Sequence, residues 1–154
     1  MAKDHIKIIA ENRKARHEYF IEDRFEAGLV LKGTEVKSLR QGRANLKDSY
    51  ARINKKGELY VHQMHISPYP FAYYNNHDPL RVRKLLMHHY EIKQLYGKMN
   101  ERGYTLVPLR LYFREGKAKI ELGLAKGKRQ HDKRETIRRR DEQRDLERQR
   151  KEYK

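Results

Sequence analysis

Apolar and polar positions alternate between Tyr19 and Leu31, which is the period of a strand with one buried face. The apolar positions of this segment are Tyr19, Ile21, Phe25, Ala27, Leu29 and Leu31. The pattern predicts one long or bent strand. A shorter apolar run from Ile6 to Ala10 predicts a strand before it, and the charged stretch 11–18 between the two suits a loop or a helical turn.

A short helix is predicted at 34–41, where two glycines bracket the sequence TEVKSLRQ. We expect Thr34 to cap its first turn, because a hydroxyl can accept a hydrogen bond from a free backbone N–H. Glu35 in the first turn, with Lys37 and Arg40 near the end, suits the helix dipole.

Two hairpins are predicted from paired apolar segments separated by turn residues. The first joins 49–53 to 58–66 through NKKG, and the second joins 104–113 to 117–124 through REGK. The second hairpin has alternating apolar positions at Leu109, Leu111, Phe113, Ala118, Ile120, Leu122 and Leu124. Pro108 predicts a sheet edge or a bulge.

Between the hairpins, Asp78-Pro79 resembles a helix start and Gly103 a helix stop, which predicts two short helices. Together these elements predict a mainly β fold, a small barrel of about five or six strands with short helices at its rim. The OB-type barrel is the nearest common architecture.

The chain has 154 residues, with 37 Lys and Arg against 21 Asp and Glu, and a net charge of +16. Such a charge attracts polyanions, and composition alone does not separate nucleic acid, an anionic membrane surface and an acidic protein. Without Cys there is no disulfide, thiolate metal site or cysteine nucleophile. No apolar segment resembles a membrane span or signal peptide, so we expect a cytoplasmic protein.

The end of the chain differs in composition from the rest. Residues 126–154 carry 13 Lys and Arg and 7 Asp and Glu, with few apolar side chains. Such a segment buries too little surface to offset its ordering entropy. We therefore divide the chain into a barrel at 1–125 and a basic tail at 126–154 that is disordered alone and can become helical against a polyanion.

Basic residues interleaved with aromatic residues and His indicate RNA among the polyanions. They occur in RKARHEYF, SPYPFAYYNNHD and RVRKLLMHHY. Lys and Arg can contact phosphates while aromatic rings stack on exposed bases, although many of the 11 Tyr belong to the core.

The histidines do not predict catalysis or a metal site. His62 and His65 would point to opposite faces of a strand, and Asp78 is better explained as a helix cap beside His77. Because the sequence has no P-loop, nucleophile elbow or zincin motif, we expect no enzymatic activity, no cofactor and no metal.

Three segments resemble the SsrA-binding (SmpB) family: 12–53, beginning NRKARHEYF; 78–86, DPLRVRKLL; and 123–137, GLAKGKRQHDKRETI. The resemblance covers essentially the whole chain. It implies an OB-type barrel with a flexible basic tail that binds the tRNA-like domain of tmRNA and accompanies it to stalled ribosomes. In that family the barrel replaces the missing anticodon arm, and the tail enters the empty mRNA channel of the small subunit. Alanyl-tRNA synthetase and elongation factor Tu act on the same RNA.

The resemblance also implies two groups of site residues. Those expected to face tmRNA are Asn12, Arg13, Glu26, Glu35, Lys37, Arg40, Leu86 and Lys119. Those expected to meet the ribosome from the tail are Lys126, Lys128, Arg129, His131, Asp132, Lys133 and Arg134. Glu26 and Glu35 could accept from a base amino group or instead hold an Arg in place, and Leu85 competes with Leu86 for the buried face.

Two other functions remain open at this point. A generic OB-type single-strand binder or ribosomal protein would use the same basic groove without a dedicated RNA. An RNA-processing enzyme would cleave RNA in the presence of Mg²⁺.

Overall fold

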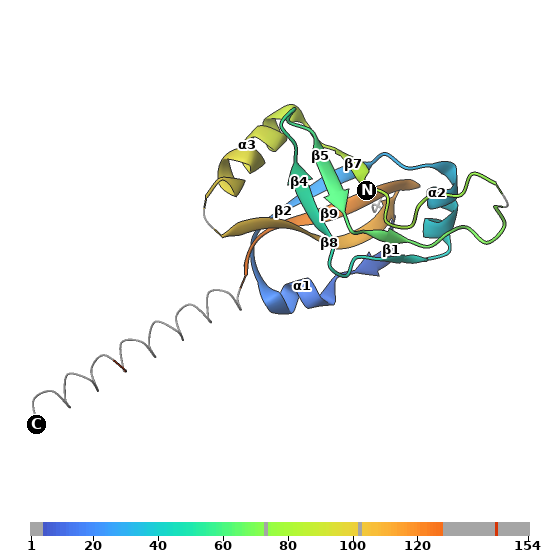
Figure 1. Ribbon diagram of the computed structural model, residues 1–154, viewed down its shortest axis with the longest axis horizontal. Coiled ribbons are helices and arrows are strands. Elements are labelled where there is room, and N and C mark those ends of the chain that lie inside the picture. Colours follow the sequence, from blue (N-terminus) through green and yellow to red (C-terminus); the bar gives the residue numbers. More distant parts are fainter. Residues whose placement is uncertain (1–4, 73, 102, 128–143, 145–154) are drawn as a thin grey trace, which may run out of the picture.

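The computed structural model describes residues 5–72, 74–101, 103–127 and 144 (Figure 1). The strands are β1 (Ile6–Glu11), β2 (Tyr19–Leu29), β3 (Ala44–Asn45), β4 (Tyr50–Ile53), β5 (Leu59–His62), β6 (His65–Ile66), β7 (Arg83–Leu86), β8 (Tyr104–Arg114) and β9 (Lys117–Gly127). The helices are α1 (Arg13–Glu18), α2 (Gly33–Arg40) and α3 (His89–Met99).

The main sheet closes into a barrel. Its strand order is β1-β8-β4-β5-β7-β2-β9, and an additional pairing between β8 and β9 joins the two sides. Every one of these pairings is antiparallel, and β1 lies outside the ring against β8. The prediction of a mainly β, OB-type barrel with short flanking helices is confirmed.

Both predicted hairpin turns are present because their sequences satisfy turn geometry. In the β4–β5 turn Gly57 has φ +80°, and in the β8–β9 turn Gly116 has φ +78°. A residue without Cβ adopts this left-handed conformation without strain.

Bulges in β2 and β8 bend these two long strands around the barrel. The register of β2 against β9 shifts between Ile21 and Asp23, and that of β8 against β9 shifts between Pro108 and Arg110. The bend predicted for the strand that begins at Tyr19 and the bulge predicted at Pro108 are therefore confirmed. Pro108 itself pairs with Leu122, and the residue left out of the register is Leu109. A proline, which has no N–H to donate, is tolerated beside such a bulge.

The cap of α2 differs from the prediction. Its N-cap is Lys32, whose backbone N–H donates to the Glu35 carboxylate at 2.8 Å. Thr34 lies inside the helix, and its hydroxyl instead contacts His77 Nδ1 at 2.9 Å. The expectation that Thr34 caps the helix was wrong because the helix begins at Gly33, which places Thr34 within the first turn and leaves the N-cap position to Lys32.

Two other segments were also predicted incorrectly. The strand predicted at 58–66 ends at His62, because Gln63 has φ +61°, and β6 then pairs with β3 in a separate sheet. The helix predicted to begin after Asp78 is absent up to His88: Asp78 starts a turn, and β7 follows it.

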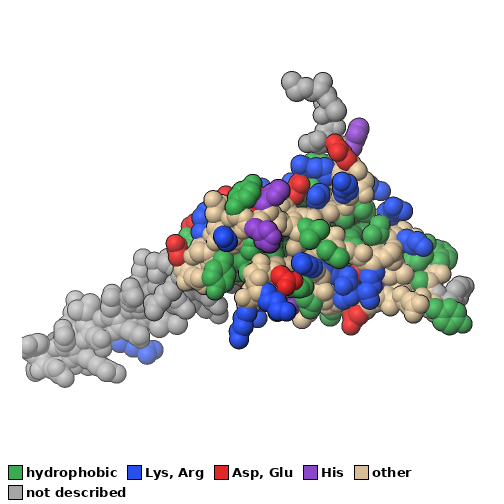
Figure 2. Space-filling model, turned by 90° about the horizontal axis from the view of Figure 1, so that it is seen from above, with side chains coloured by type: hydrophobic (Ala, Val, Ile, Leu, Met, Phe, Trp, Pro, Cys, Tyr) green, Lys and Arg blue, Asp and Glu red, His purple; other side chains and the backbone are tan. Residues whose placement is uncertain are grey.

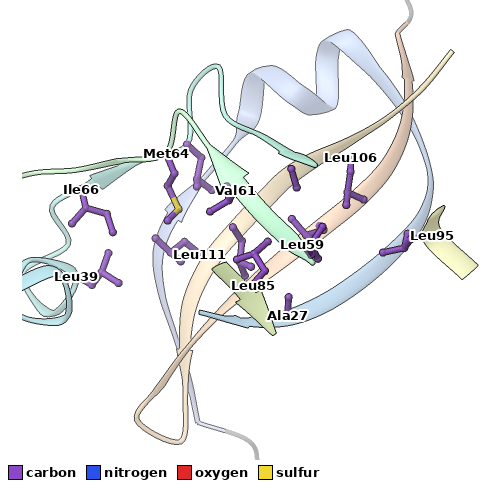
Figure 3. Close-up of a cluster of buried hydrophobic side chains, with 14 of the residues drawn as sticks. Ala27, Leu39, Leu59, Val61, Met64, Ile66, Leu85, Leu95, Leu106 and Leu111 are labelled. Atoms are coloured by element: carbon purple, nitrogen blue, oxygen red, sulfur yellow. The ribbon is translucent and has the colours of Figure 1, made fainter. Parts of the chain in front are cut away.

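Apolar side chains from most strands meet inside the barrel (Figure 3). Leu59, Leu85, Leu106 and Leu111 are each at most 1% exposed. Leu95 of α3 packs into the same cluster, so α3 covers one end of the barrel. A smaller cluster joins α1 to the outer side of β8 and β9 through Ala15, Val107, Leu109 and Ala125.

The barrel extends slightly beyond the predicted boundary at residue 125. Lys126 and Gly127 belong to β9 and pair with Phe20 and Tyr19 of β2. In the described part of the chain, no helix is long and apolar enough to cross a membrane.

Candidate nucleic-acid interface

Three of the predicted RNA-facing residues meet on the outer face of the barrel. Gly28 of β2 pairs with Leu86 of β7 on one side and with Lys119 of β9 on the other. Glu26 lies two residues before Gly28 on the same face. A Cβ built on Gly28 would lie 3.5 Å from Leu86 Cβ and 3.7 Å from Lys119 Nζ, so these side chains adjoin over the glycine.

Leu86, rather than Leu85, is the surface leucine of this pair. Leu86 is 52% exposed, whereas Leu85 is 1% exposed and belongs to the core. Alternation along β7 requires this division, since successive strand residues point to opposite faces. An exposed leucine beside a cation can contact a base or ribose while the cation meets a phosphate.

Glu26 is held by neighbours on β8. Its carboxylate accepts a hydrogen bond from the Tyr112 hydroxyl and pairs with Arg114 Nη2 at 3.1 Å. Burial raises the pKa of Tyr112, and the hydrogen bond to Glu26 raises it further. The phenol therefore remains a donor at neutral pH, which fixes the position of the carboxylate.

Cations flank the Tyr112 ring. The guanidinium carbons of Arg110 and Arg114 lie 5.4 Å and 5.8 Å from its centroid. Arg110 also pairs with Glu121 at 2.8 Å. Sequence reasoning missed this group, in which Arg110 and Arg114 are partly exposed and Tyr112 is buried between them. Their alternation with the inward-facing residues of β8 predicts that all three lie on the outward face of the strand.

Asn12 and Arg13 lie at the start of α1, away from this group. Asn12 is 7% exposed, and its side chain donates to the carbonyls of Leu46 and Pro108 while accepting from the Ala15 N–H. Its observed role is therefore to fasten α1 to β8. Arg13 is exposed and available to an RNA.

Glu35 is buried rather than RNA-facing. It is fully buried, and its carboxylate pairs with Arg81 and with the equally buried Arg83. Burial alone would raise its pKa, but hydrogen bonds from Arg81, Lys32 and Arg83 hold the pKa below its ordinary value. The expectation of a direct RNA contact at Glu35 does not fit this position, and the alternative that it holds an Arg in place does.

Lys37 and Arg40 are exposed on α2, which is a third, separate location of predicted RNA-facing residues. Lys37 Nζ lies 5.5 Å from the centroid of Tyr69, at the base of a loop that exposes aromatic side chains. In that loop Phe71 is 68% and Tyr74 87% exposed, which leaves both rings open to stacking.

Of the predicted tail residues, the structure describes Lys126, whose ammonium lies 4.6 Å from the Tyr104 ring centroid. The other predicted tail residues lie outside the described part of the chain; they are Lys128, Arg129, His131, Asp132, Lys133 and Arg134.

The histidine next to Asp78 has a structural role. His77 is 3% exposed, and its two ring nitrogens contact Thr34 and the Ile66 carbonyl, each at 2.9 Å. Among the described residues, no group of three or more His, Asp or Glu side chains could hold a metal ion.

Comparisons of this chain with known proteins all find similarity to the same family. The family model described as SmpB protein matches residues 9–152. The SsrA-binding protein of Geobacillus thermodenitrificans is 60% identical over 148 residues, covering 96% of this chain and 95% of the relative. That of Syntrophobacter fumaroxidans is 61% identical over 145 residues, covering 94% of this chain and 89% of the relative.

A solved structure described as "tmRNA-SmpB: a journey to the center of the bacterial ribosome" contains a similar chain. It is 52% identical, with a TM-score of 0.67, and the alignment covers 84% of this chain and 94% of that chain.

Proposed function

Because the chain belongs to the SmpB family, we propose that it binds the tRNA-like domain of tmRNA and brings that RNA to stalled ribosomes for trans-translation. The relatives are named for SsrA binding, and the similar solved chain is described with tmRNA and the bacterial ribosome. The net charge of +16 suits both partners, since each is a polyanion.

The observation that carries the proposal within this chain is the meeting of Leu86 and Lys119 over Gly28, with Glu26 two residues earlier on the same face of β2. Each offers RNA a different interaction. Lys119 can neutralise a phosphate, Leu86 can pack on a base or ribose, and Glu26 can accept from a base amino group. A carboxylate repels phosphates, so the position of Glu26, held by Arg114 and the Tyr112 hydroxyl, favours recognition of a base edge.

We assign the finer roles in the same proposal. The barrel stands where the anticodon arm of a tRNA would be, and the basic tail beyond β9 enters the vacant mRNA channel of the small subunit. The protein acts as a cytoplasmic adaptor without catalytic chemistry, and alanyl-tRNA synthetase and elongation factor Tu meet it only through the shared RNA.

Comparative filter binding tests this function. The full-length protein should bind a transcript of the tRNA-like domain of tmRNA more tightly than an unstructured oligonucleotide of equal length. Equal affinity for the two would favour a generic single-strand binder. Incubation of the labelled transcript with protein and Mg²⁺ should leave it intact, because cleavage would indicate a processing enzyme.

A further inference from the structure

An open groove of about 440 Å³ lies between the β4–β5 turn and α3. One wall is the turn that carries Lys55 and Lys56, and the other is the first half of α3 with His89 and Lys93. Figure 2 views the molecule from the side on which this turn and α3 lie, where His, basic and hydrophobic side chains interleave. None of these groove residues belongs to the RNA-facing group assigned above.

The lysines of the groove have few competing anions. All three are exposed, and within the described residues no carboxylate forms an ion pair with Lys55, Lys56 or Lys93. Glu58, at the end of the same turn, pairs with Lys84 at 3.2 Å and accepts from the Tyr60 hydroxyl. Glu58 also interacts electrostatically with Lys56, so the groove presents its positive charge mainly at Lys55 and Lys93, from two separate elements, which suits an extended polyanion.

Hydrogen bonds fix the backbone of the turn that carries Lys55 and Lys56. The side-chain oxygen of Asn54 accepts from the backbone N–H groups of Lys56 at 3.0 Å and Glu58 at 2.9 Å. The Asn54 N–H donates to the Glu58 carbonyl, and the Gly57 N–H donates to the Asn54 carbonyl. A preformed turn loses little conformational entropy when a ligand binds.

Between the cations, the groove offers an apolar and aromatic surface. Ile92 is 8% exposed at its base, and Tyr96 is 54% exposed. Beside the groove, the rings of His88 and Tyr90 stack at 5.5 Å with an interplanar angle of 13°. Lysines around an exposed tyrosine combine phosphate and base contacts, as in single-stranded nucleic-acid sites.

The groove continues the surface around Leu86. His89 follows Leu86 by three residues, and the pairing of Leu59 with Leu85 places the β4–β5 hairpin beside β7. An RNA that covers Leu86 and Lys119 thus needs little additional length to reach Lys55 and Lys93. This continuity favours tmRNA over ribosomal RNA as the occupant.

We propose that this groove is a second tmRNA site, in which Lys55 and Lys93 neutralise backbone phosphates from opposite walls and Tyr96 stacks on a base. The proposal rests on the proposed function, because it takes the RNA at Leu86 to be tmRNA. It extends the contact surface from the outer face of β7-β2-β9 around to the end of the barrel that α3 covers.

A pair of double variants of the full-length protein tests the proposal. Lys55→Ala/Lys93→Ala removes two charges from the groove, and Lys7→Ala/Lys47→Ala removes two exposed charges elsewhere. Affinity for the tRNA-like domain of tmRNA is measured over a range of salt concentrations. The groove variant should bind on the order of tenfold more weakly, with a log-log salt slope shallower by about 1.4 to 1.8. The control should lose much less.

Lysine acetylation gives a second readout that needs no variant. Bound tRNA-like domain should protect Lys55 and Lys93 but leave Lys7 reactive. Tyr96→Leu, which keeps apolar contact with Ile92 but removes the ring, should weaken binding several-fold without changing the salt slope.

Three results would overturn the assignment in distinguishable ways. If both double variants lose affinity equally while wild type still prefers the tRNA-like domain, the groove is no site but the proposed function stands. If the groove variant binds tmRNA normally yet fails on stalled ribosomes, the groove meets ribosomal RNA instead. If wild type itself shows no preference, the proposed function fails first.

Discussion

Glu35 and Arg83 form an ion pair in which neither side chain is exposed to solvent. The two residues are 48 positions apart, and their contact fastens α2 to β7 inside the molecule. Arg83 also donates to the Met64 carbonyl, and Arg81 shares the same carboxylate from a partly exposed position. A buried carboxylate thus joins α2 to β7, and Arg83 extends the connection to the chain at Met64.

Removal of this carboxylate should destabilise the fold. Glu35→Ala leaves Arg83 as an unpaired buried charge, for which we expect a loss of about 3–5 kcal/mol in the free energy of unfolding. Urea denaturation followed by circular dichroism measures it. The double variant Glu35→Leu/Arg83→Met should recover much of the loss, because it removes both charges together. A loss below about 1 kcal/mol in the single variant would contradict this role.

The ion pair between Glu35 and Arg83 should also make the free energy of unfolding depend on pH in the acidic range. The pKa of Glu35 lies below its ordinary value of 4.5 in the folded protein. A lowered folded pKa contributes stability that is fully present above the unfolded value and is lost as pH falls through the folded one. The unfolding free energy should therefore decrease below about pH 4.5, more steeply for wild type than for Glu35→Gln. Equal slopes for the two proteins would show that other carboxylates dominate the acid response.

Neighbouring leucines should separate stability from RNA binding. Leu85→Ala opens a cavity in the core and should cost about 2–5 kcal/mol. Leu86→Ala changes a surface position and should cost about 0.5 kcal/mol or less. Affinity for the tRNA-like domain of tmRNA, measured below the unfolding transition, should fall for Leu86→Ala and stay near wild type for Leu85→Ala. The reverse order in the binding assay would remove Leu86 from the interface.

Tyr112 and Glu26 should act as a unit in RNA binding. Tyr112→Phe keeps the ring between Arg110 and Arg114 but frees Glu26 from its hydroxyl donor. We expect each of Tyr112→Phe and Glu26→Gln to weaken binding several-fold, and the double variant to be little worse than either one. Such non-additivity is the signature of residues that share one network. Strictly additive losses would mean that the two side chains contribute separately.

The sequence pattern predicted most of the barrel, because the features that shape its strands and turns are encoded by neighbouring residues. The two turns, the long bent strand and the proline bulge each follow from a few adjacent residues. β7 was missed because its inward position is occupied by Arg83, which reads as a surface residue in any pattern based on hydrophobicity. Its burial depends on Glu35, a partner that only the folded chain brings near.

The candidate site was predictable to a lesser degree. Glu26, Leu86 and Lys119 come from three separate segments, and strand register determines that Leu86 and Lys119 meet over Gly28 on the face that also carries Glu26. The family resemblance identified these three residues as candidates for RNA contact, but it did not predict how they are arranged in space. It also placed Asn12 and Glu35 at the RNA, whereas their side chains are engaged inside the protein.

Cutting the chain after Gly127 should separate the two halves of the proposed function. The cut leaves β9 complete. Lys126 keeps its pairing with Phe20, and the Lys126 ammonium keeps its contact with the Tyr104 ring. The removed segment has too few apolar residues to stabilise the barrel. We therefore expect an unchanged unfolding free energy and nearly unchanged affinity for the tRNA-like domain. A cut after Ala125 provides a contrast, since it removes paired strand residues and should lower stability.

The activity that should disappear on cutting after Gly127 is peptidyl transfer to alanyl-tmRNA on ribosomes that lack downstream mRNA. The removed residues include His131, Lys133 and Arg134, and their segment is strongly basic, which suits an RNA-lined channel. Gel-shift affinity and transfer are measured in parallel for full-length and truncated protein. Normal transfer by the truncated protein would exclude a role for the tail. Loss of RNA binding together with transfer would instead mean that barrel and tail form one continuous RNA site.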